Sequence, residues 1–372
     1  MNQAKSWIIS LCMCLLNTNL LIAQTTIKKV NDLLTREMKE QKIPGLELVV
    51  IKDKKIVLSE AKGVANIEFS VPVTDATIFS INSIAKVFTG TAIMQLVEKG
   101  KINLDNAVGD YLDSLPVNWQ KVTLKQLLGH ISGLPDIEDD FTGGLVGNKG
   151  EDTAWKVVQT MPLQFKPGEQ FSYNATNYLL LQKIIEKFGK LPFEQYIQQH
   201  QLDIIGMRKT KFGNSFEVEK GKAPTYMYYE KDKNTGEYIK SEKLIQTYEN
   251  FPKTFRADAG MFSTANDMAK WLISLTSEHR LLNNSNSIET MWTPVKLNNG
   301  KTEGFGGILN GYALGWLVVD RSQHPAVAAI GGGRAAILVY PRDDLAIILF
   351  TNLSGCSPEL IVDKIAKLYF NH

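Results

Sequence analysis

The stretch from Phe79 to Gly100 constrains this chain most, because it joins a helix pattern to a serine and a lysine. Apolar residues recur every four positions from Ile84 to Leu96, and Gly100 follows where a helix C-cap belongs. Ser83 stands just before the first apolar residue, and Lys86 lies about one turn further on the same face. A hydroxyl at the positive end of a helix with an amine beside it suits a nucleophile and its base.

Ser-x-x-Lys occurs a second time, at Ser59 and Lys62. This copy lies in or just after an expected strand at Ile56–Leu58, where residues three apart point to opposite faces of the sheet. The structural context therefore favours the copy at Ser83. The alternative for Ser83 is a helix-capping serine with a solvated lysine nearby.

Composition and motifs exclude several classes of protein. The 372 residues carry a formal net charge of +2, with 44% hydrophobic and 22% charged residues, so there is no basic footprint for nucleic acid. Gly-x-Ser-x-Gly does not occur, which argues against an α/β-hydrolase. The five histidines are scattered singly, and neither His-Glu-x-x-His nor a dinucleotide or phosphate loop occurs. We expect no metal and no cofactor.

The N-terminal residues 1–23 have the pattern of a secretory signal peptide. A positive start precedes the apolar run Trp7–Leu16, and Ala23 stands where a signal peptidase would cut. The alternative is a membrane anchor, but the apolar run is short and is followed by two asparagines. We expect a periplasmic or secreted protein whose mature chain has no membrane span. Its only cysteine would be Cys356, so no intramolecular disulfide could form.

The distribution of helix and strand patterns predicts an α+β fold. An antiparallel sheet would be built from both ends of the chain and flanked by helices, and the middle would form a mainly helical lobe. We expect one domain over 24–372, with the sheet lobe at about 27–80 and 255–372 and the helical lobe at about 81–254. Two partly buried strands are expected on either side of Asn234-Thr235-Gly236. The other main expected elements are a helix at 27–41, strands at 46–51, 56–61, 312–319, 335–340 and 345–351, and a helix after Ser357.

Four segments in order resemble the serine β-lactamase and penicillin-binding-protein superfamily. They are Ser83-Ile84-Ala85-Lys86, Leu127–Pro135, Phe165–Tyr178 and Ala259–Asp267. The resemblance covers about Ile27 to Tyr369. It is closest to the branch that contains class C β-lactamases, D-Ala-D-Ala carboxypeptidases and related esterases, and it implies a β-lactamase/transpeptidase-like fold.

The resemblance also implies a mechanism. Ser83 would attack a carbonyl and form an acyl-enzyme, Lys86 would help to take its proton, and Tyr173 would act as base and proton carrier. A lysine near a phenolate or in a dry cleft can have a lowered pKa, which would suit this role. The backbone N–H of Ser83 would supply half of an oxyanion hole, and the edge strand behind the third motif the other half.

The chain departs from the family pattern in two motifs. The second motif, usually Tyr-x-Asn, has Ala175 in place of its asparagine, and Asn174 or Asn177 could compensate. The third motif, usually Lys-Thr-Gly or His-x-Gly, reads Ile330-Gly331-Gly332 and has no cation. Arg334 could offer a positive charge just past the glycines. Asn174, Gly332, Gly333 and Arg334 are therefore the candidate substrate-binding residues, with a glycine-rich strand entry as the alternative for the glycines.

These departures affect the substrate more than the ability to acylate. The prediction is a secreted or periplasmic serine hydrolase acting on an ester or an amide, peptide-like substrates included. One alternative is a β-lactamase or D-Ala-D-Ala carboxypeptidase. Another is a catalytically weakened relative that binds a ligand without turning it over. The oligomeric state is left open.

Overall fold

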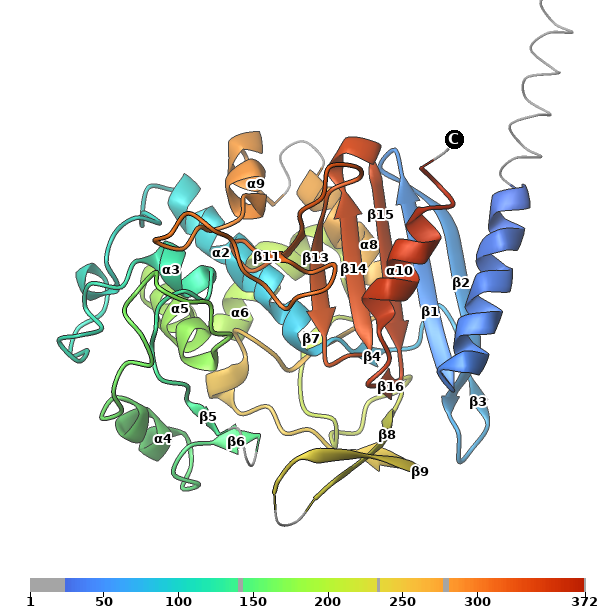
Figure 1. The fold of residues 1–372 in the computed structure, drawn as a ribbon, viewed down its shortest axis with the longest axis horizontal. Helices are drawn as coiled ribbons and strands as arrows, with labels where there is room; N and C mark the ends of the chain where they lie inside the picture. The colour runs from blue at the N-terminus through green and yellow to red at the C-terminus, as the bar shows by residue number, and fades with distance from the viewer. Residues whose placement is uncertain (1–23, 140–142, 233–234, 277–280, 371–372) are drawn as a thin grey trace, which may run out of the picture.

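The computed structural model describes residues 24–139, 143–232, 235–276 and 281–370. Its centre is an eight-stranded sheet in the order β11-β12-β13-β14-β15-β1-β2-β3, and all neighbouring strands are antiparallel. Strands from both ends of the chain meet where β1 pairs with β15, as the sequence predicts (Figure 1). The strands are β1 Gly45–Lys52, β2 Lys55–Asn66, β3 Val71–Pro72, β11 Gly311–Tyr312, β12 Leu317–Val319, β13 Ala326–Gly331, β14 Ala335–Tyr340 and β15 Leu345–Thr351.

Both faces of this sheet are covered, because successive side chains of a strand point to opposite sides. In β1, Leu48 and Val50 pack in one core with the helix 24–40 and with α10 Pro358–Ala366. Val49 and Ile51 belong to the other core, on the side of α8 Ala265–Thr276. Figure 1 shows α10 in front of the sheet and α8 behind it. Burial on both faces explains why the central strands read as nearly continuous apolar runs.

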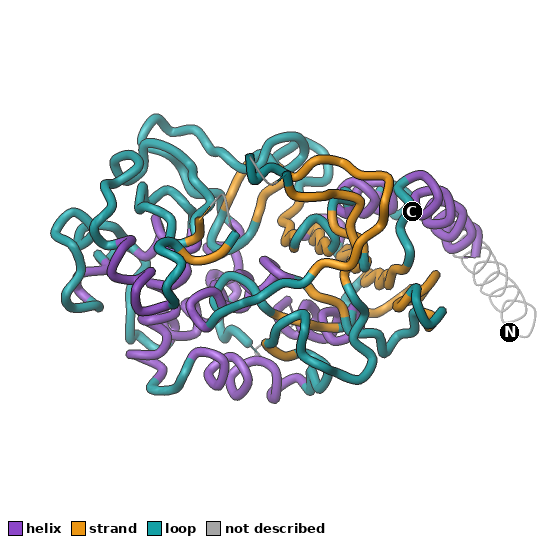
Figure 2. The backbone as a smooth tube through the Cα atoms, turned by 90° about the horizontal axis from the view of Figure 1, so that it is seen from below, coloured by secondary structure: helices purple, strands orange, loops and turns teal. Residues whose placement is uncertain are grey.

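The middle of the chain forms the helical part of the molecule. Its central helix, α2 Ala85–Glu98, is buried on every side from Ala85 to Leu96 instead of along one stripe. Figure 2 shows most strands in the half of the molecule next to the helix 24–40 and most of the other helices in the opposite half. The remaining helices are α3 Leu124–Leu128, α4 Glu151–Val158, α5 Ala175–Gly189, α6 Phe193–Ile197, α7 Asp203–Ile205 and α9 Ser285–Trp292.

Smaller strands surround this framework. A three-stranded sheet of β4 Phe79–Ser80, β10 Met261–Ser263 and β7 Lys211–Phe212 leads into the turn that carries Ser83. The hairpin expected around Asn234-Thr235-Gly236 is present as β8 Thr225–Lys231 and β9 Tyr238–Thr247, and β8 also pairs in parallel with β16 Leu353–Ser354. The remaining pair is β5 Glu138–Asp139 with β6 Gly144–Leu145.

One strand prediction was wrong, and one strand of the central sheet was missed. The segment expected as one strand at 312–319 is two strands, β11 and β12, joined by a turn in which Gly315 has a φ of +84°. The neighbouring strand β13 was not predicted, because its sequence is short and rich in alanine, which has little strand preference. The predicted signal peptide lies outside the described residues. Among those residues, no helix has the length and apolar character that a membrane span requires.

Candidate active site

Ser83 lies in a 3₁₀ turn, Asn82–Ile84, that leads directly into α2. Asn82 has a φ of +41°, in the left-handed region that asparagine tolerates better than most residues. Its side chain is held on both sides: Ser80 Oγ donates to Asn82 Oδ1 at 3.2 Å, and Asn82 Nδ2 donates to Glu249 Oε1 at 3.1 Å. These contacts fix the backbone turn that presents Ser83.

Lys86 is buried one turn into the molecule from Ser83. Its Nζ lies 3.2 Å from the backbone oxygen of Asp258 and 3.5 Å from Asp258 Oδ2. The same atom is 4.3 Å from the ring centroid of Tyr173 and 5.0 Å from that of Tyr178. Burial lowers the pKa of Lys86, but Tyr173 and Asp258 outweigh burial and the net pKa is raised. The lysine therefore does not have the lowered pKa that a dry cleft alone would give, because Tyr173 and the buried carboxylate of Asp258 both lie beside it.

His130 packs against the Tyr173 ring and helps to position it. The two ring centroids are 4.4 Å apart, and the imidazole is fully buried. The backbone N–H of Asn174 donates to His130 Nδ1 at 3.1 Å, so Nδ1 is the unprotonated nitrogen. Burial, with a smaller effect of the charge on Lys86, holds the pKa of His130 well below its usual value. The histidine is thus a neutral support for the tyrosine.

Ser83 and Tyr173 line the same small pocket, and the end of β13 forms another of its sides. Strand β12 pairs with β13 only from Ala326 to Ala328, so the last residues of β13 extend past it beside Ser83. The structure therefore brings the three predicted catalytic residues together. The residues that line the pocket are all uncharged: Ser83, Tyr173, Phe305, Tyr312, Gly315, Leu317, Ala328, Ala329 and Ile330.

The structure places both candidate asparagines in the scaffold. Asn174 caps α5: its Oδ1 accepts from the backbone N–H of Asn177 at 3.2 Å, and its Nδ2 donates to Leu134 O at 2.8 Å. Asn177 Oδ1 accepts from Ser132 Oγ at 2.6 Å. Both side chains are buried and occupied by these bonds. The role in substrate binding that we expected of Asn174 has no support in this geometry.

Gly332 and Gly333 form the tight turn between β13 and β14, with φ of +55° and +59°. The backbone N–H of Arg334 closes this turn on Gly331 O at 3.1 Å. A Cβ on Gly331 would lie 1.9 Å from Ile81 O, so β13 approaches the Ser83 turn more closely than any other residue type allows. Turn geometry and close approach account for the glycine run without a substrate.

Arg334 does not reach the pocket as a free cation. Its side chain is 2% exposed and forms an ion pair with Glu249, with Nη2 2.6 Å from Oε2. It also donates to Ser80 Oγ at 3.0 Å and to Ser354 Oγ at 2.6 Å. Arg334 and Glu249 together connect the turn after β13 to the Asn82 turn. The predicted role of Arg334 as a substrate cation therefore conflicts with its burial and pairing.

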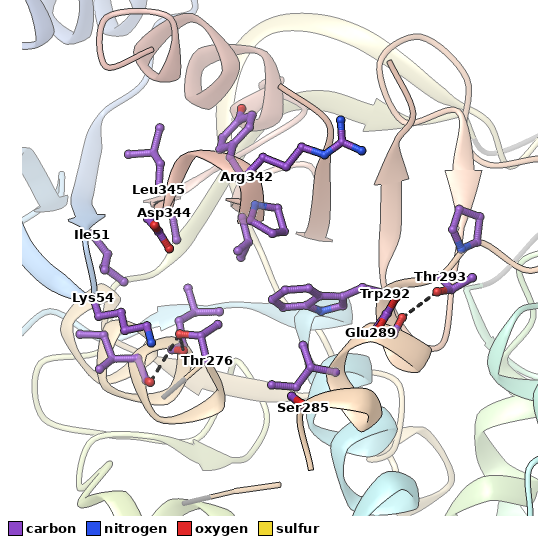
Figure 3. Close-up of a pocket in the computed structure, with 18 residues that line it drawn as sticks. Ile51, Lys54, Thr276, Ser285, Glu289, Trp292, Thr293, Arg342, Asp344 and Leu345 are labelled. Atoms are coloured by element: carbon purple, nitrogen blue, oxygen red, sulfur yellow. Dashed lines mark hydrogen bonds between the residues drawn. The ribbon is translucent and has the colours of Figure 1, made fainter. Parts of the chain in front are cut away.

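A larger cavity of about 690 Å³ lies elsewhere, between α8, α9 and the turn that follows β14. Figure 3 shows Trp292 within it, with Lys54 and Arg342 at opposite sides. None of the three predicted catalytic residues lines this cavity. Among the described residues, no group of three or more His, Cys, Asp or Glu side chains could hold a metal ion.

Three residues of the site were not predicted from the sequence: Asp258, Glu249 and His130. Asp258 directly precedes the segment Ala259–Asp267 that resembles the family, so its place beside a motif could have drawn attention to it. His130 lies inside a second such segment. Glu249 is 85 positions from Arg334 in the chain, and no sequence pattern connects the two residues.

An antiparallel sheet covered on both faces, with Ser-x-x-Lys at the start of a buried helix and a tyrosine opposite, is the β-lactamase/transpeptidase-like architecture. The Beta-lactamase family model matches residues 30–369. The chain belongs to the β-lactamase family.

Individual relatives are distant. The chain is 24% identical over 352 residues to Protein flp of Staphylococcus aureus (strain MW2), which covers 93% of this chain and 67% of that protein. An octameric penicillin-binding protein homologue from Pyrococcus abyssi has a similar structure, with a TM-score of 0.75 and 28% identity over 93% of this chain and 77% of the other. A class C β-lactamase mutant shares the fold, with a TM-score of 0.73 and 17% identity over 92% and 97% of the two chains.

Proposed function

We propose that the protein is a serine hydrolase that forms an acyl-enzyme on Ser83 and cleaves an ester or an amide, peptide-like substrates included. The observation that carries this proposal is the meeting of three residues. Ser83 and Tyr173 line one pocket, and Nζ of Lys86 lies 4.3 Å from the Tyr173 ring centroid. A serine nucleophile needs an adjacent base, and a neighbouring ammonium group stabilises the phenolate that can serve as one.

In the proposed reaction, Ser83 Oγ adds to the substrate carbonyl carbon while its proton passes to the phenolate oxygen of Tyr173. The tetrahedral adduct then collapses, the bond to the leaving alcohol or amine breaks, and the leaving group takes the proton from Tyr173. Water repeats these steps on the Ser83 ester and releases the acid. The backbone N–H of Ser83 and one N–H at the end of β13 would bind the oxyanion.

The charges around the pocket favour an ester or a neutral amide over a substrate that carries a carboxylate. All residues that line the pocket are uncharged, and Ile330 stands where the family usually has a cation. The nearby guanidinium group of Arg334 is buried and paired with Glu249. A carboxylate of the kind found in β-lactams and D-Ala peptides would lose its hydration without gaining a cation. Esters also need less help with the leaving group than amides.

We also propose that the protein is exported, with residues 1–23 removed after Ala23. The support is the sequence alone: a positive start, a short apolar run and a small residue before Gln24. Expression of the full chain in a bacterial host should yield an exported protein. Its measured mass should equal that of a chain that begins at Gln24. A protein that keeps its first 23 residues and stays with the membrane would favour the anchor instead.

The first experiment is intact mass spectrometry after incubation with an activated aryl ester and, separately, with a β-lactam. We expect ester turnover or a mass increase that disappears in Ser83→Ala. Ser59→Ala is the matched control, because Ser59 belongs to the other Ser-x-x-Lys and is exposed on β2. Stronger reaction with the β-lactam would favour the β-lactamase or carboxypeptidase alternative. A folded protein that reacts with neither reagent would favour the ligand-binding alternative.

A further inference from the structure

Asp258 places a buried carboxylate beside the motif lysine. It is 6% exposed, and its Oδ2 lies 3.5 Å from Nζ of Lys86, whose side chain is 2% exposed. Among the described residues, Lys86 is the one cation within ion-pair distance of this carboxylate. Both groups are buried, and a buried charge is stable only if it is paired.

The backbone around Asp258 is fixed from two directions. Thr89, one turn along α2 from Lys86, donates from Oγ1 to Ala257 O at 2.6 Å. Arg256 donates from Nη1 to Gly260 O at 3.1 Å and to Gly213 O at 2.7 Å. The carboxylate is therefore held in place relative to α2 by bonds on either side of it. A preorganised partner of this kind costs little to bring into position during a reaction.

The net charge around Lys86 favours its protonated form. Tyr173 and Asp258 together overcome the effect of burial, so the pKa of Lys86 is raised. Burial raises the pKa of the Asp258 carboxyl, and the ammonium group of Lys86 counteracts that rise. The titratable groups that face Lys86 or act on it from the surrounding elements are Tyr173, Tyr178, Asp258, Glu138, His130 and Asp136.

We propose that Asp258 is a positioning residue for the acylation reaction: its carboxylate keeps Lys86 charged and beside Tyr173, which leaves Tyr173 as the base. This inference rests on the proposed function of the Ser83 site. A lysine that keeps its proton cannot accept the proton of Ser83, whereas it can stabilise a phenolate that does. Asp258 thereby supplies a polar partner to the lysine in a site where Ala175 has replaced the motif asparagine.

The test that does not depend on activity is an NMR titration of the full mature protein with nitrogen-labelled lysine side chains. The Lys86 signal is assigned by its absence in Lys86→Met. We expect Lys86 to keep its proton to a higher pH in the native protein than in Asp258→Asn, because the variant lacks the neighbouring carboxylate. A neutral Lys86 at about pH 8 in the native protein would overturn the proposal, whether or not the variant folds.

The second test is the pH profile of kcat/KM for an aryl ester, with the Ser83→Ala rate subtracted. We expect Asp258→Asn to lose about tenfold in kcat/KM toward alkaline pH, under conditions in which the native enzyme keeps its rate. Asp267→Asn is the control, because Asp267 is an equally buried acid whose partner, Lys270, is 2.7 Å away outside the pocket. It should keep the native profile.

Three outcomes separate the proposals. If the native enzyme turns over the ester and Asp258→Asn keeps the native pH profile, the role of Asp258 is refuted and the hydrolase stands. If Asp258→Asn gains activity at neutral pH, Lys86 is the base and the proposal is again refuted. If the native enzyme has no activity, the hydrolase fails, and the NMR titration still decides whether Asp258 holds the charge on Lys86.

Discussion

Glu47 is a buried carboxyl group in the middle of an otherwise apolar strand, and its effect on the stability of the protein should be measurable. Its side chain is 0% exposed; Oε2 accepts from the backbone N–H of Ala265 at 2.9 Å, and Oε1 accepts from Asn266 Nδ2 at 3.2 Å. Glu47 thus joins β1 to the first turn of α8. Burial is the main cause that raises the pKa of Glu47 to about 8.

We expect Glu47→Gln to remove a pH-dependent loss of stability. Between the usual glutamate pKa of 4.5 and the folded pKa of about 8, the folded chain holds a proton that the unfolded chain has lost. Stability therefore falls as pH rises through this window, by about 1.4 kcal/mol per pH unit. The free energy of unfolding is measured with urea at about pH 5 and at about pH 8. Between these two pH values, the variant should gain about 3 to 4 kcal/mol of stability relative to the native protein. Parallel loss of stability in both proteins would contradict this.

At the scale of elements, the junction between β13 and the Ser83 turn depends on one glycine. A Cβ at Gly331 would lie 1.9 Å from Ile81 O, a backbone atom that cannot move without moving Asn82 and Ser83. We expect Gly331→Ala to cost about 2 kcal/mol or more and to suppress ester turnover in the protein that remains folded. Urea unfolding and active-site labelling measure the two effects.

Gly300→Ala is the comparison for this prediction. Gly300 has a φ of +80°, and no atom lies within 4 Å of a Cβ placed there. Its replacement should cost about 1 to 2 kcal/mol from backbone strain and leave the activity per folded molecule unchanged. If Gly331→Ala behaves in the same way, close approach does not control the Ser83 turn.

The sequence predicts the elements of this fold better than the contacts between them. Periodicity located α2, and the apolar runs located β1, β14 and β15, since each is long and buried. The strand β13 was not predicted, because its six residues are rich in alanine and show no clear hydrophobic pattern of a strand. The three catalytic candidates could be predicted because they stand in local motifs. The ion pair of Arg334 with Glu249 could not, because only the folded backbone brings those residues together.

At the scale of the molecule, the sheet makes the two cores depend on each other. Adjacent residues of β14 and β15 face opposite cores, so the two cores share the same strands. The ion pair of Lys364 with Glu37, at 2.5 Å, joins α10 to the helix 24–40. Damage to that layer should therefore reach the other core through the shared strands and the pocket through the core that α10 covers.

Ile361→Asp tests this dependence, with Leu360→Asp as its neighbour on α10. Ile361 is 0% exposed in the outer core, whereas Leu360 is 42% exposed. We expect Ile361→Asp to cost more than about 3 kcal/mol, because a buried apolar side chain is replaced by an unpaired carboxylate. Leu360→Asp should stay within about 0.5 kcal/mol, as a surface change near the start of a helix. Ester turnover and helix content should be lost at the same urea concentration in each protein, with both midpoints lowered together in Ile361→Asp. Turnover that persists after α10 has unfolded would mean that the two cores fold independently.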